Sequence, residues 1–155
     1  IGGSNMDFVL DLSGFEKLDK ELETIANTTI KVGVLGEDKV DGVSVQEYAI
    51  WNEYGTIYIP SRPFFRVACM SRKAQREIKA YMNKRIMDVV DGKISASVYL
   101  NAIGTFVVER IKMTIRTYPF QPNSPITLAN KNTTLPLTDT GTLLRSIAFE
   151  LVGGK

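Results

Sequence analysis

Few side chains in this sequence could carry out chemistry, and histidine is absent from all 155 residues. Histidine is the usual general base near neutral pH, a common zinc ligand and the usual partner of a catalytic serine or cysteine. The ordinary triads and most zinc sites are therefore excluded. The chain also lacks the phosphate-binding motifs GxxxxGK[ST] and GxGxxG and the serine motifs GxSxG and SxxK.

Two groups could still react or bind a metal without histidine, and each has a simpler structural explanation. Cys69 is the only cysteine and follows apolar residues within about one helical turn, so we expect a core thiol. Glu37, Asp38 and Asp41 are close together, but their spacing matches no calcium-binding loop. They predict a solvated turn instead.

A pair of carboxylates is the remaining candidate for hydrolysis. Glu53 and Asp139 could form it only if the fold brought them together. Asp139 is better explained as a helix cap, and Glu53 as an ion-pair partner for Arg62 or Arg66. We therefore expect no catalytic residue, metal site or cofactor in this chain.

A basic cluster occupies the middle of the sequence, with Arg72, Lys73, Arg76, Lys79, Lys84 and Arg85. Helical spacing roughly aligns Arg72, Arg76 and Lys79. With Lys73, they could face DNA phosphates, which need positive charge but no base-reading geometry. They could equally contact the first fifty residues of a neighbouring copy, which hold ten acids and four bases, or form a solvated helix face.

The overall composition fits a single globular domain. A hydrophobic content of 44% and a charged content of 23% are ordinary, and 155 residues can bury a core. No apolar run approaches the roughly 18 residues of a membrane span, so no membrane contact is expected. Residues 1–5 resemble a remnant of cloning, with Met6 as the native start and 6–155 as one domain. A single cysteine, Cys69, excludes an internal disulfide and is compatible with a reducing compartment.

Hydrophobic spacing predicts an α+β fold in the first third of the chain. A helix over 14–26 places Phe15, Leu18, Leu22 and Ile25 on one face, with a capping box formed by Ser13 and Glu16. Residues 28–35 alternate and are β-branched, which predicts a strand. Residues 36–42 predict a charged turn, and Ser44 with Glu47 forms a second capping box for a helix to residue 54.

The remainder predicts two long helices and a returning strand. One helical pattern runs from Pro63 to about residue 90, with a possible break in 71–77, and Ser95 caps the next helix. That helix has an apolar stripe: Tyr99, Leu100, Ile103, Val107, Ile111 and Ile115. Gly104 within it predicts close packing against another backbone. Residues 118–135 predict a flexible loop or arm that orders on assembly. Thr138 or Asp139 then caps a helical turn at 141–144, and 146–152 should pair with 28–35.

The segment 48–66, YAIWNEYGTIYIPSRPFFR, is the most distinctive part of the chain. Gly55 should end the first helix in a left-handed conformation, and 56–59 should form a short strand or extended link. Pro63 suits the first turn of the following helix, where a missing N–H costs nothing. The segment therefore predicts a structural joint, by which we mean the connection from one helix to the next over 48–66.

This segment resembles a stretch of tailed-phage neck and minor tail proteins, in which "NEFGT" leads to "IPARPF". Residues 131–147, KNTTLPLTDTGTLLRSI, resemble the element "K…PLIDTG.L..SI" that closes such proteins. The step Ala102-Ile103-Gly104 between them also fits, so the resemblance covers about 28–152. Tyr54, Ser61 and Thr138 depart from the commoner residues of that pattern.

The resemblance to this tail-completion and head–tail joining family implies a small antiparallel or mixed sheet packed by two long helices. It implies a non-catalytic subunit of a ring, commonly of six copies, in the neck or tail of a virion. Its partners would be the connector or head-closure protein, a tail-tube or tail-terminator protein, and non-specific DNA in the lumen. The implied structural or interface residues are Trp51, Glu53, Gly55, Pro60, Arg62, Pro63, Phe64, Arg66, Lys131, Pro136, Asp139, Gly141 and Leu143.

Other functions stay open at this point. A tail terminator or head-closure protein of the same virion fits the same residues. A DNA-binding module that uses the basic helix 72–85 is a second class, and salt-dependent gel shifts would separate it from a structural subunit. A virion-borne hydrolase is a third class, against which the lack of histidine argues.

Overall fold

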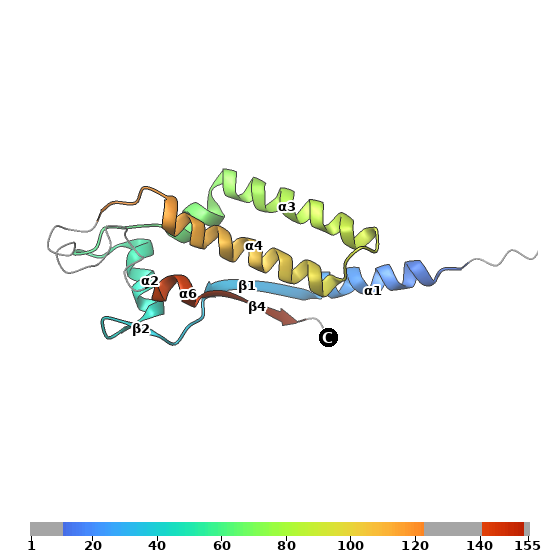
Figure 1. Cartoon of the computed structure of the whole chain (residues 1–155), viewed down its shortest axis with the longest axis horizontal. Helices are drawn as coiled ribbons and strands as arrows, with labels where there is room; N and C mark the ends of the chain where they lie inside the picture. Colours follow the sequence, from blue (N-terminus) through green and yellow to red (C-terminus); the bar gives the residue numbers. More distant parts are fainter. Residues whose placement is uncertain (1–10, 123–140, 154–155) are drawn as a thin grey trace, which may run out of the picture.

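The computed structural model describes residues 11–122 and 141–153 as an α+β fold, as predicted. The first elements in chain order are α1 (Ser13–Asn27), β1 (Thr28–Val34), β2 (Lys39–Val40), β3 (Val43–Ser44), α2 (Val45–Tyr54) and the π-helical turn η1 (Arg66–Met70). They are followed by α3 (Arg72–Val90), α4 (Ala96–Thr117), α6 (Thr142–Ser146) and β4 (Ile147–Gly153). The long helices α3 and α4 lie over the sheet, and α4 is the nearer to it (Figure 1). No helix in the described ranges is long and apolar enough to cross a membrane.

The main sheet joins two segments that lie far apart in the sequence. β1 and β4 are antiparallel, with Thr28 opposite Gly153 and Val34 opposite Ile147. The predicted pairing of these two segments is confirmed, although Ser146 belongs to α6 and not to the strand. The sheet is two-stranded within the described residues, so α4 covers one face of a very small sheet.

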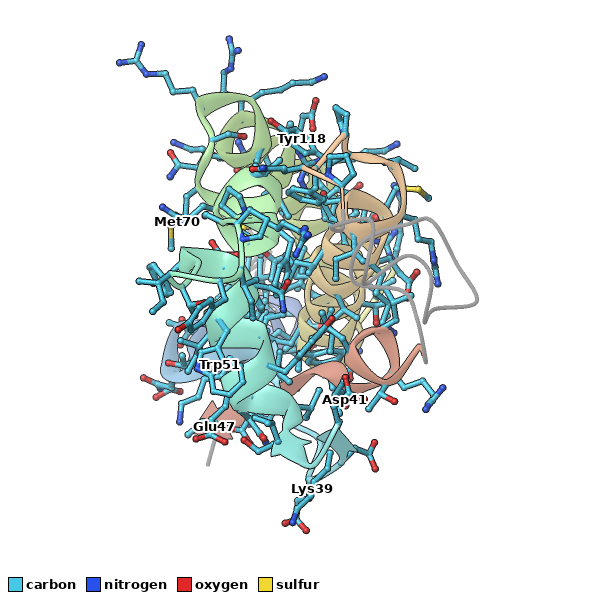
Figure 2. All side chains as sticks on the ribbon, turned by 90° about the vertical axis from the view of Figure 1, so that its left-hand side faces the viewer. Lys39, Asp41, Glu47, Trp51, Met70 and Tyr118 are labelled. Atoms are coloured by element: carbon cyan, nitrogen blue, oxygen red, sulfur yellow. The ribbon has the colours of Figure 1, made fainter. Side chains whose placement is uncertain are left out.

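The predicted charged turn over 36–42 is partly a hairpin. Lys39 pairs with Ser44 and Val40 with Val43 across the turn Asp41-Gly42. Both turn residues have positive φ, 52° and 83°, which is the conformation that an Asp-Gly turn favours between antiparallel strands. Lys39 and Asp41 lie at the lower end of the molecule in Figure 2.

Helix α4 is the centre of the core. Ile111 and Ile115 pack with Phe64, and Tyr99 and Ile103 pack in a second cluster nearer α1. The predicted apolar stripe is confirmed with one shift, because Val108 is buried and Val107 only half-buried. The close approach predicted at Gly104 is also confirmed, but its neighbour is the ring of Phe149 on β4 and not a backbone.

The helix caps follow the sequence with one correction. Ser44, Ser71 and Ser95 accept hydrogen bonds from backbone N–H groups three residues later, which confirms the predicted caps at Ser44 and Ser95. The capping box at Ser13 is wrong, because Ser13 lies inside α1 and makes no cap hydrogen bond. Asp11 Oδ1 accepts the Ser13 N–H at 2.9 Å, so an earlier carboxylate supplies the acceptor. This hydrogen bond lowers the pKa of Asp11.

Helix α1 is only partly covered by the rest of the described chain. It begins and ends within one residue of the predicted helix, and its C-terminal end packs through Ile25. Phe15 near its start is 72% exposed, and no residue of α1 is fully buried. Figure 1 shows α1 extending beyond the end of the α3–α4 pair.

We predict that Gly104→Ala destabilises the protein. A Cβ at position 104 would lie within 2.6 Å of Phe149 ring atoms, so the ring must move. Overpacking of this kind costs about 1–3 kcal/mol, which exceeds the roughly 1 kcal/mol gained in helix propensity. The free energy of unfolding, measured by urea denaturation, should therefore fall.

Gly14→Ala is the matched control, since it is also a helical glycine but has open space around it. It should be neutral or stabilising by up to about 1 kcal/mol. Equal stability of the wild-type protein and Gly104→Ala would contradict the assigned packing.

Candidate functional site

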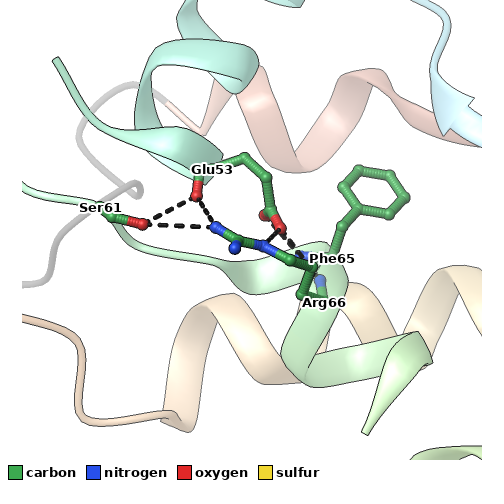
Figure 3. Close-up of polar contacts among 4 residues, drawn as sticks. All are labelled: Glu53, Ser61, Phe65 and Arg66. Carbon is green, nitrogen blue, oxygen red and sulfur yellow. Dashed lines mark hydrogen bonds and ion pairs between the residues drawn. The ribbon is translucent and has the colours of Figure 1, made fainter.

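A buried carboxylate organises segment 48–66. Glu53, at the end of α2, is 6% exposed. Its Oε2 accepts the N–H of Phe65 at 2.9 Å, and its Oε1 accepts the N–H and Nε of Arg66 at 3.1 and 3.0 Å (Figure 3). Glu53 therefore satisfies backbone donors at the start of the next helical segment, where a negative charge is favoured.

The main chain of Glu53 takes part in the same joint. Its carbonyl oxygen accepts hydrogen bonds from Arg66 Nη2 at 2.6 Å and from Ser61 Oγ at 2.9 Å. The Arg66 guanidinium also lies 5.1 Å from the centre of the Tyr54 ring, a cation–π distance. The predicted ion pair of Glu53 is thus confirmed with Arg66.

Arg62 has a different role from Arg66. It is 4% exposed and donates from Nη1 to Asn52 Oδ1 at 3.0 Å. Its Nε and Nη2 donate to the carbonyls of Gln121 at 2.9 Å and Pro122 at 3.3 Å, just beyond α4. Burial lowers the pKa of the Arg62 guanidinium, which stays protonated at neutral pH. Arg62 therefore links the joint to the chain that leaves α4.

The link between Gly55 and Pro60 is a tight bend, so the predicted strand or extended segment over 56–59 is wrong. The Thr56 N–H donates to the Ile59 carbonyl at 2.8 Å. Thr56 Oγ1 accepts the N–H groups of Tyr58 and Ile59 at 3.1 and 3.0 Å, which offers the backbone an alternative to a strand. Ile57 and Tyr58 stand at the tip of this bend, 89% and 88% exposed.

Gly55 ends α2 at a positive φ, as predicted, but its ψ of 168° lies outside the left-handed helical region. Its φ is 79°, and its N–H donates to the Trp51 carbonyl at the end of α2. A Cβ here would lie 2.9 Å from the Ser61 backbone nitrogen. Trp51 itself is 38% exposed and lies on the same side of the molecule as Met70 in Figure 2.

The two segments that carried the resemblance meet in the core. Phe64, which follows Pro63, is completely buried and belongs to one apolar cluster with Leu143 of α6 and Ile147 of β4. The Val67 N–H donates to the Pro63 carbonyl at 2.9 Å, so Pro63 does sit in the first helical turn. Gly141 precedes α6 in a left-handed conformation, with φ 68°.

Several predicted residues fall outside the described ranges. These are Lys131, Pro136, Thr138 and Asp139, together with most of the loop predicted over 118–135. The predicted caps of α6 and a Glu53–Asp139 pair therefore stay untested. Within the described part of that loop, Tyr118 and Phe120 pack their rings 4.7 Å apart.

The long helix is broken just before most of the segment 71–77, where the break was predicted. A π-helical turn ends at Met70, Ser71 caps α3, and residues 72–77 are helical. In η1 the Ser71 N–H donates to Arg66 O, five residues back, at 3.1 Å. Arg110 of α4 donates to the Ala68 carbonyl at 2.6 Å and pairs with Glu77 of α3 at 2.6 Å. Arg110 thus fastens the break to α4.

Cys69 lies in η1, half-buried against the apolar core, close to the core thiol that the sequence predicted. Burial raises the pKa of its thiol. In the described residues, no three of the side chains Cys, Asp and Glu converge as metal ligands would.

The basic cluster is aligned as predicted. Arg72, Arg76 and Lys79 line one surface hollow on α3 together with Gln75. Lys73 points to Glu77 at 3.9 Å. Contact of this face with DNA stays a prediction.

The sequence indicated a structural role for Asn52 but gave no such indication for Ser61. Asn52 follows Val45 and Ala49 on the buried face of α2, and its side-chain Nδ2 donates to the Tyr48 carbonyl at 2.8 Å. A polar residue on an apolar face indicates a buried hydrogen bond, so the role of Asn52 could have been found. Ser61 gave no such signal, because serine is ordinary in a turn.

Comparisons with protein-family models, curated proteins and solved structures found no match for this chain.

We predict that Glu53→Ala lowers the free energy of unfolding by about 3 kcal/mol. The lower end of the range for breaking a buried ion pair applies, because the Arg66 side chain is 45% exposed and can reach water. Two backbone N–H groups would still lose their acceptor. Chemical denaturation measures the change.

Glu109→Ala is the control, because Glu109 pairs with Lys112 at 3.7 Å on an exposed helix face. It should change stability by less than about 0.5 kcal/mol. If both variants match the wild-type protein, Glu53 does not hold the joint.

We also predict that Cys69 reacts slowly with iodoacetamide near pH 8. A raised pKa leaves less thiolate at a given pH, so the midpoint of the pH–rate profile should lie higher in the folded protein than in urea. The comparison in urea serves as the internal control. A midpoint equal to or below that of the unfolded chain would be inconsistent with burial of this thiol.

Proposed function

We propose that this chain is a structural protein of a bacteriophage or prophage virion, of the neck or tail-completion type. In this proposal it assembles as a ring at the head–tail junction or the tail end, without catalysis. Its partners are the connector or head-closure protein on one side and tail proteins on the other. A tail terminator or head-closure protein of the same virion is the nearest variant of this function.

The observation that carries the proposal is the convergence of the two resembling segments on one core. Phe64 comes from the first segment and Leu143 from the second, and both are buried in the same cluster. In the first segment, Glu53, Arg62 and Arg66 are committed to holding the backbone, as an architectural motif requires. These three motif residues are therefore accounted for by structure alone.

The surface around the joint supports an assembly role. The bend that follows Gly55 is held by the Thr56 hydroxyl and by Ser61, yet it presents Ile57 and Tyr58 almost completely to solvent. A rigid bend that exposes two large apolar side chains is typical of a contact site for another protein. In a virion, that contact would be a neighbouring subunit or a tail protein.

DNA binding through α3 is the second candidate, and the aligned side chains of Arg72, Arg76 and Lys79 favour it. Among the described residues, no acid forms an ion pair with these three. Binding by such a face would be non-specific and would weaken steeply as salt is raised. It is compatible with a ring through which a genome passes.

We predict that Ile57→Ser combined with Tyr58→Ser blocks virion completion while leaving the fold intact. Both side chains are exposed, so the free energy of unfolding should change by less than about 0.5 kcal/mol per site. In the phage or prophage that encodes the chain, unjoined heads and tails should accumulate. Electron microscopy of lysates measures this, and antibody-gold labelling locates the wild-type protein in virions.

Met87→Ser with Met113→Ser is the matched control, since both methionines are exposed and lie on α3 and α4. It should leave virion yield unchanged. If the Ile57/Tyr58 variant forms normal virions, the bend is not the contact site. Absence of the wild-type protein from virions would overturn the proposed function.

A further inference from the structure

The apolar stripe on α1 is only partly covered by the rest of the described chain, least of all at its start. Phe15 is 72% exposed and Leu22 38%, and Leu18 between them is half-buried. The helix is fixed at its other end, where Ile25 packs in the core and Glu21 accepts the N–H of Ala96. The start of α1 therefore extends beyond the α3–α4 pair from a firm attachment at its other end (Figure 1).

An acidic stripe runs beside the apolar one. Glu16, Asp19 and Glu23 directly follow Phe15, Leu18 and Leu22, so they lie about 100° further round the helix. No described residue forms an ion pair with these three acids. The exposed part of α1 thus offers an apolar face with negative charge along one side.

An open apolar groove lies between β1, α3 and α4, with the last residue of the α1 stripe, Ile25, at its border. Its volume is about 530 Å³. Ile30 and Val32 line it from β1, Ile78 and Met82 from α3, and Ile103 from α4. β1 pairs only with β4 among the described strands, so its outer edge is open along this groove.

The wall of the groove that α3 forms has positive charge beside it. Arg72, Arg76 and Lys79 lie along α3 at the same spacing, three to four residues, as the acids on α1. Lys79 directly follows the groove residue Ile78, just as each acid follows an apolar residue of α1. The two surfaces therefore match in both apolar character and charge.

The α1 of the same chain is not placed to fill this groove. Ile25 and Thr28 themselves line it, so α1 leaves from its border. The exposed stripe begins at the opposite end of the helix, which extends past α3 and α4 (Figure 1). A second copy of the chain can supply the helix without any change in this structure.

We propose that α1 of one copy docks in the β1–α3 groove of the next copy. Phe15, Leu18 and Leu22 cover the apolar groove, and Glu16, Asp19 and Glu23 face Arg72, Arg76 and Lys79. Each copy gives a helix to one neighbour and receives one from the other. Such a head-to-tail contact closes into a ring when the rotation between copies allows it. The inference rests on the proposed ring and names its subunit contact.

The first test reverses the charges. Asp19→Arg with Glu23→Arg places positive charge on both surfaces, and Arg76→Glu with Lys79→Glu places negative charge on both. Each double variant alone should self-associate about tenfold more weakly than the wild-type protein in sedimentation equilibrium, because two ion pairs are replaced by repulsion. An equimolar mixture of the two variants should regain wild-type association.

Glu37→Arg with Asp38→Arg is the charge-matched control, in the turn that follows β1, and should associate normally. Circular dichroism of each variant checks that it folds. Failure of the mixture to recover, or a wild-type protein that stays monomeric at every concentration, would overturn the inference.

The second test uses the native thiol in the groove. Leu18→Cys adds a thiol at the half-buried middle of the stripe, and a short bifunctional maleimide should join it to Cys69, which lines the groove. A long incubation is used, because burial raises the pKa of the Cys69 thiol and slows its reaction. Covalent dimers and longer chains are expected. In the control, Leu18→Cys with Cys69→Ser, the introduced thiol can react only with its counterpart in another copy, so the products stop at dimers. A link formed within one monomer would overturn the inference.

These outcomes are separate from those of the virion experiments. If gold labelling finds the protein in virions but charge reversal does not weaken self-association, the proposed function stands and this contact is rejected. If charge reversal weakens self-association but gold labelling finds no protein in virions, the contact stands and the proposed function is rejected.

Discussion

The fold of segment 48–66 depends on one buried carboxylate, that of Glu53. Glu53 closes α2 and at the same time receives the first N–H groups of the helical segment that leads into η1, so two successive elements share one acceptor. Arg66 compensates its charge from a half-exposed position, which limits the desolvation cost of the pair. Glu53 precedes the bend, its carbonyl oxygen accepts from Ser61 and its carboxylate accepts from Phe65 after it. Ile57 and Tyr58 are therefore exposed on a backbone that is held on both sides.

A second constraint is the contact between α4 and the sheet. Gly104 lets the ring of Phe149 lie directly on the helix, and the neighbouring core residues, Ile103 above all, face the groove beside β1. A two-stranded sheet is marginal by itself, so α4 supplies most of the apolar surface that stabilises it. The position of that groove, and hence of any subunit contact there, follows from the same packing.

The sequence predicted what regular spacing controls. The strands β1 and β4 and the stripe on α4 follow from periodicity, and the glycine at position 104 indicated close packing. Local chemistry identified the caps at Ser44 and Ser95, but the short strands β2 and β3 were expected only as a turn. Prediction from the sequence failed where two side chains compete for the same role. At the start of α1 the hydrogen-bond acceptor is Asp11 and not Ser13. Prediction failed at Thr56 because a side-chain hydroxyl overrode β propensity. The partners of Glu53 and Arg62 depend on three-dimensional contacts, which one sequence does not contain.

The pairing of β1 with β4 has a consequence for synthesis of the chain. These strands lie far apart in the sequence, so β1 is made first and its partner leaves the ribosome more than a hundred residues later. Until then both edges of β1 offer unpaired backbone groups, which are templates for aggregation. Closing so long a loop is also slow compared with forming α3 and α4. The β1 strands of different nascent chains must therefore stay apart until β4 has been made. This requirement follows from the topology alone.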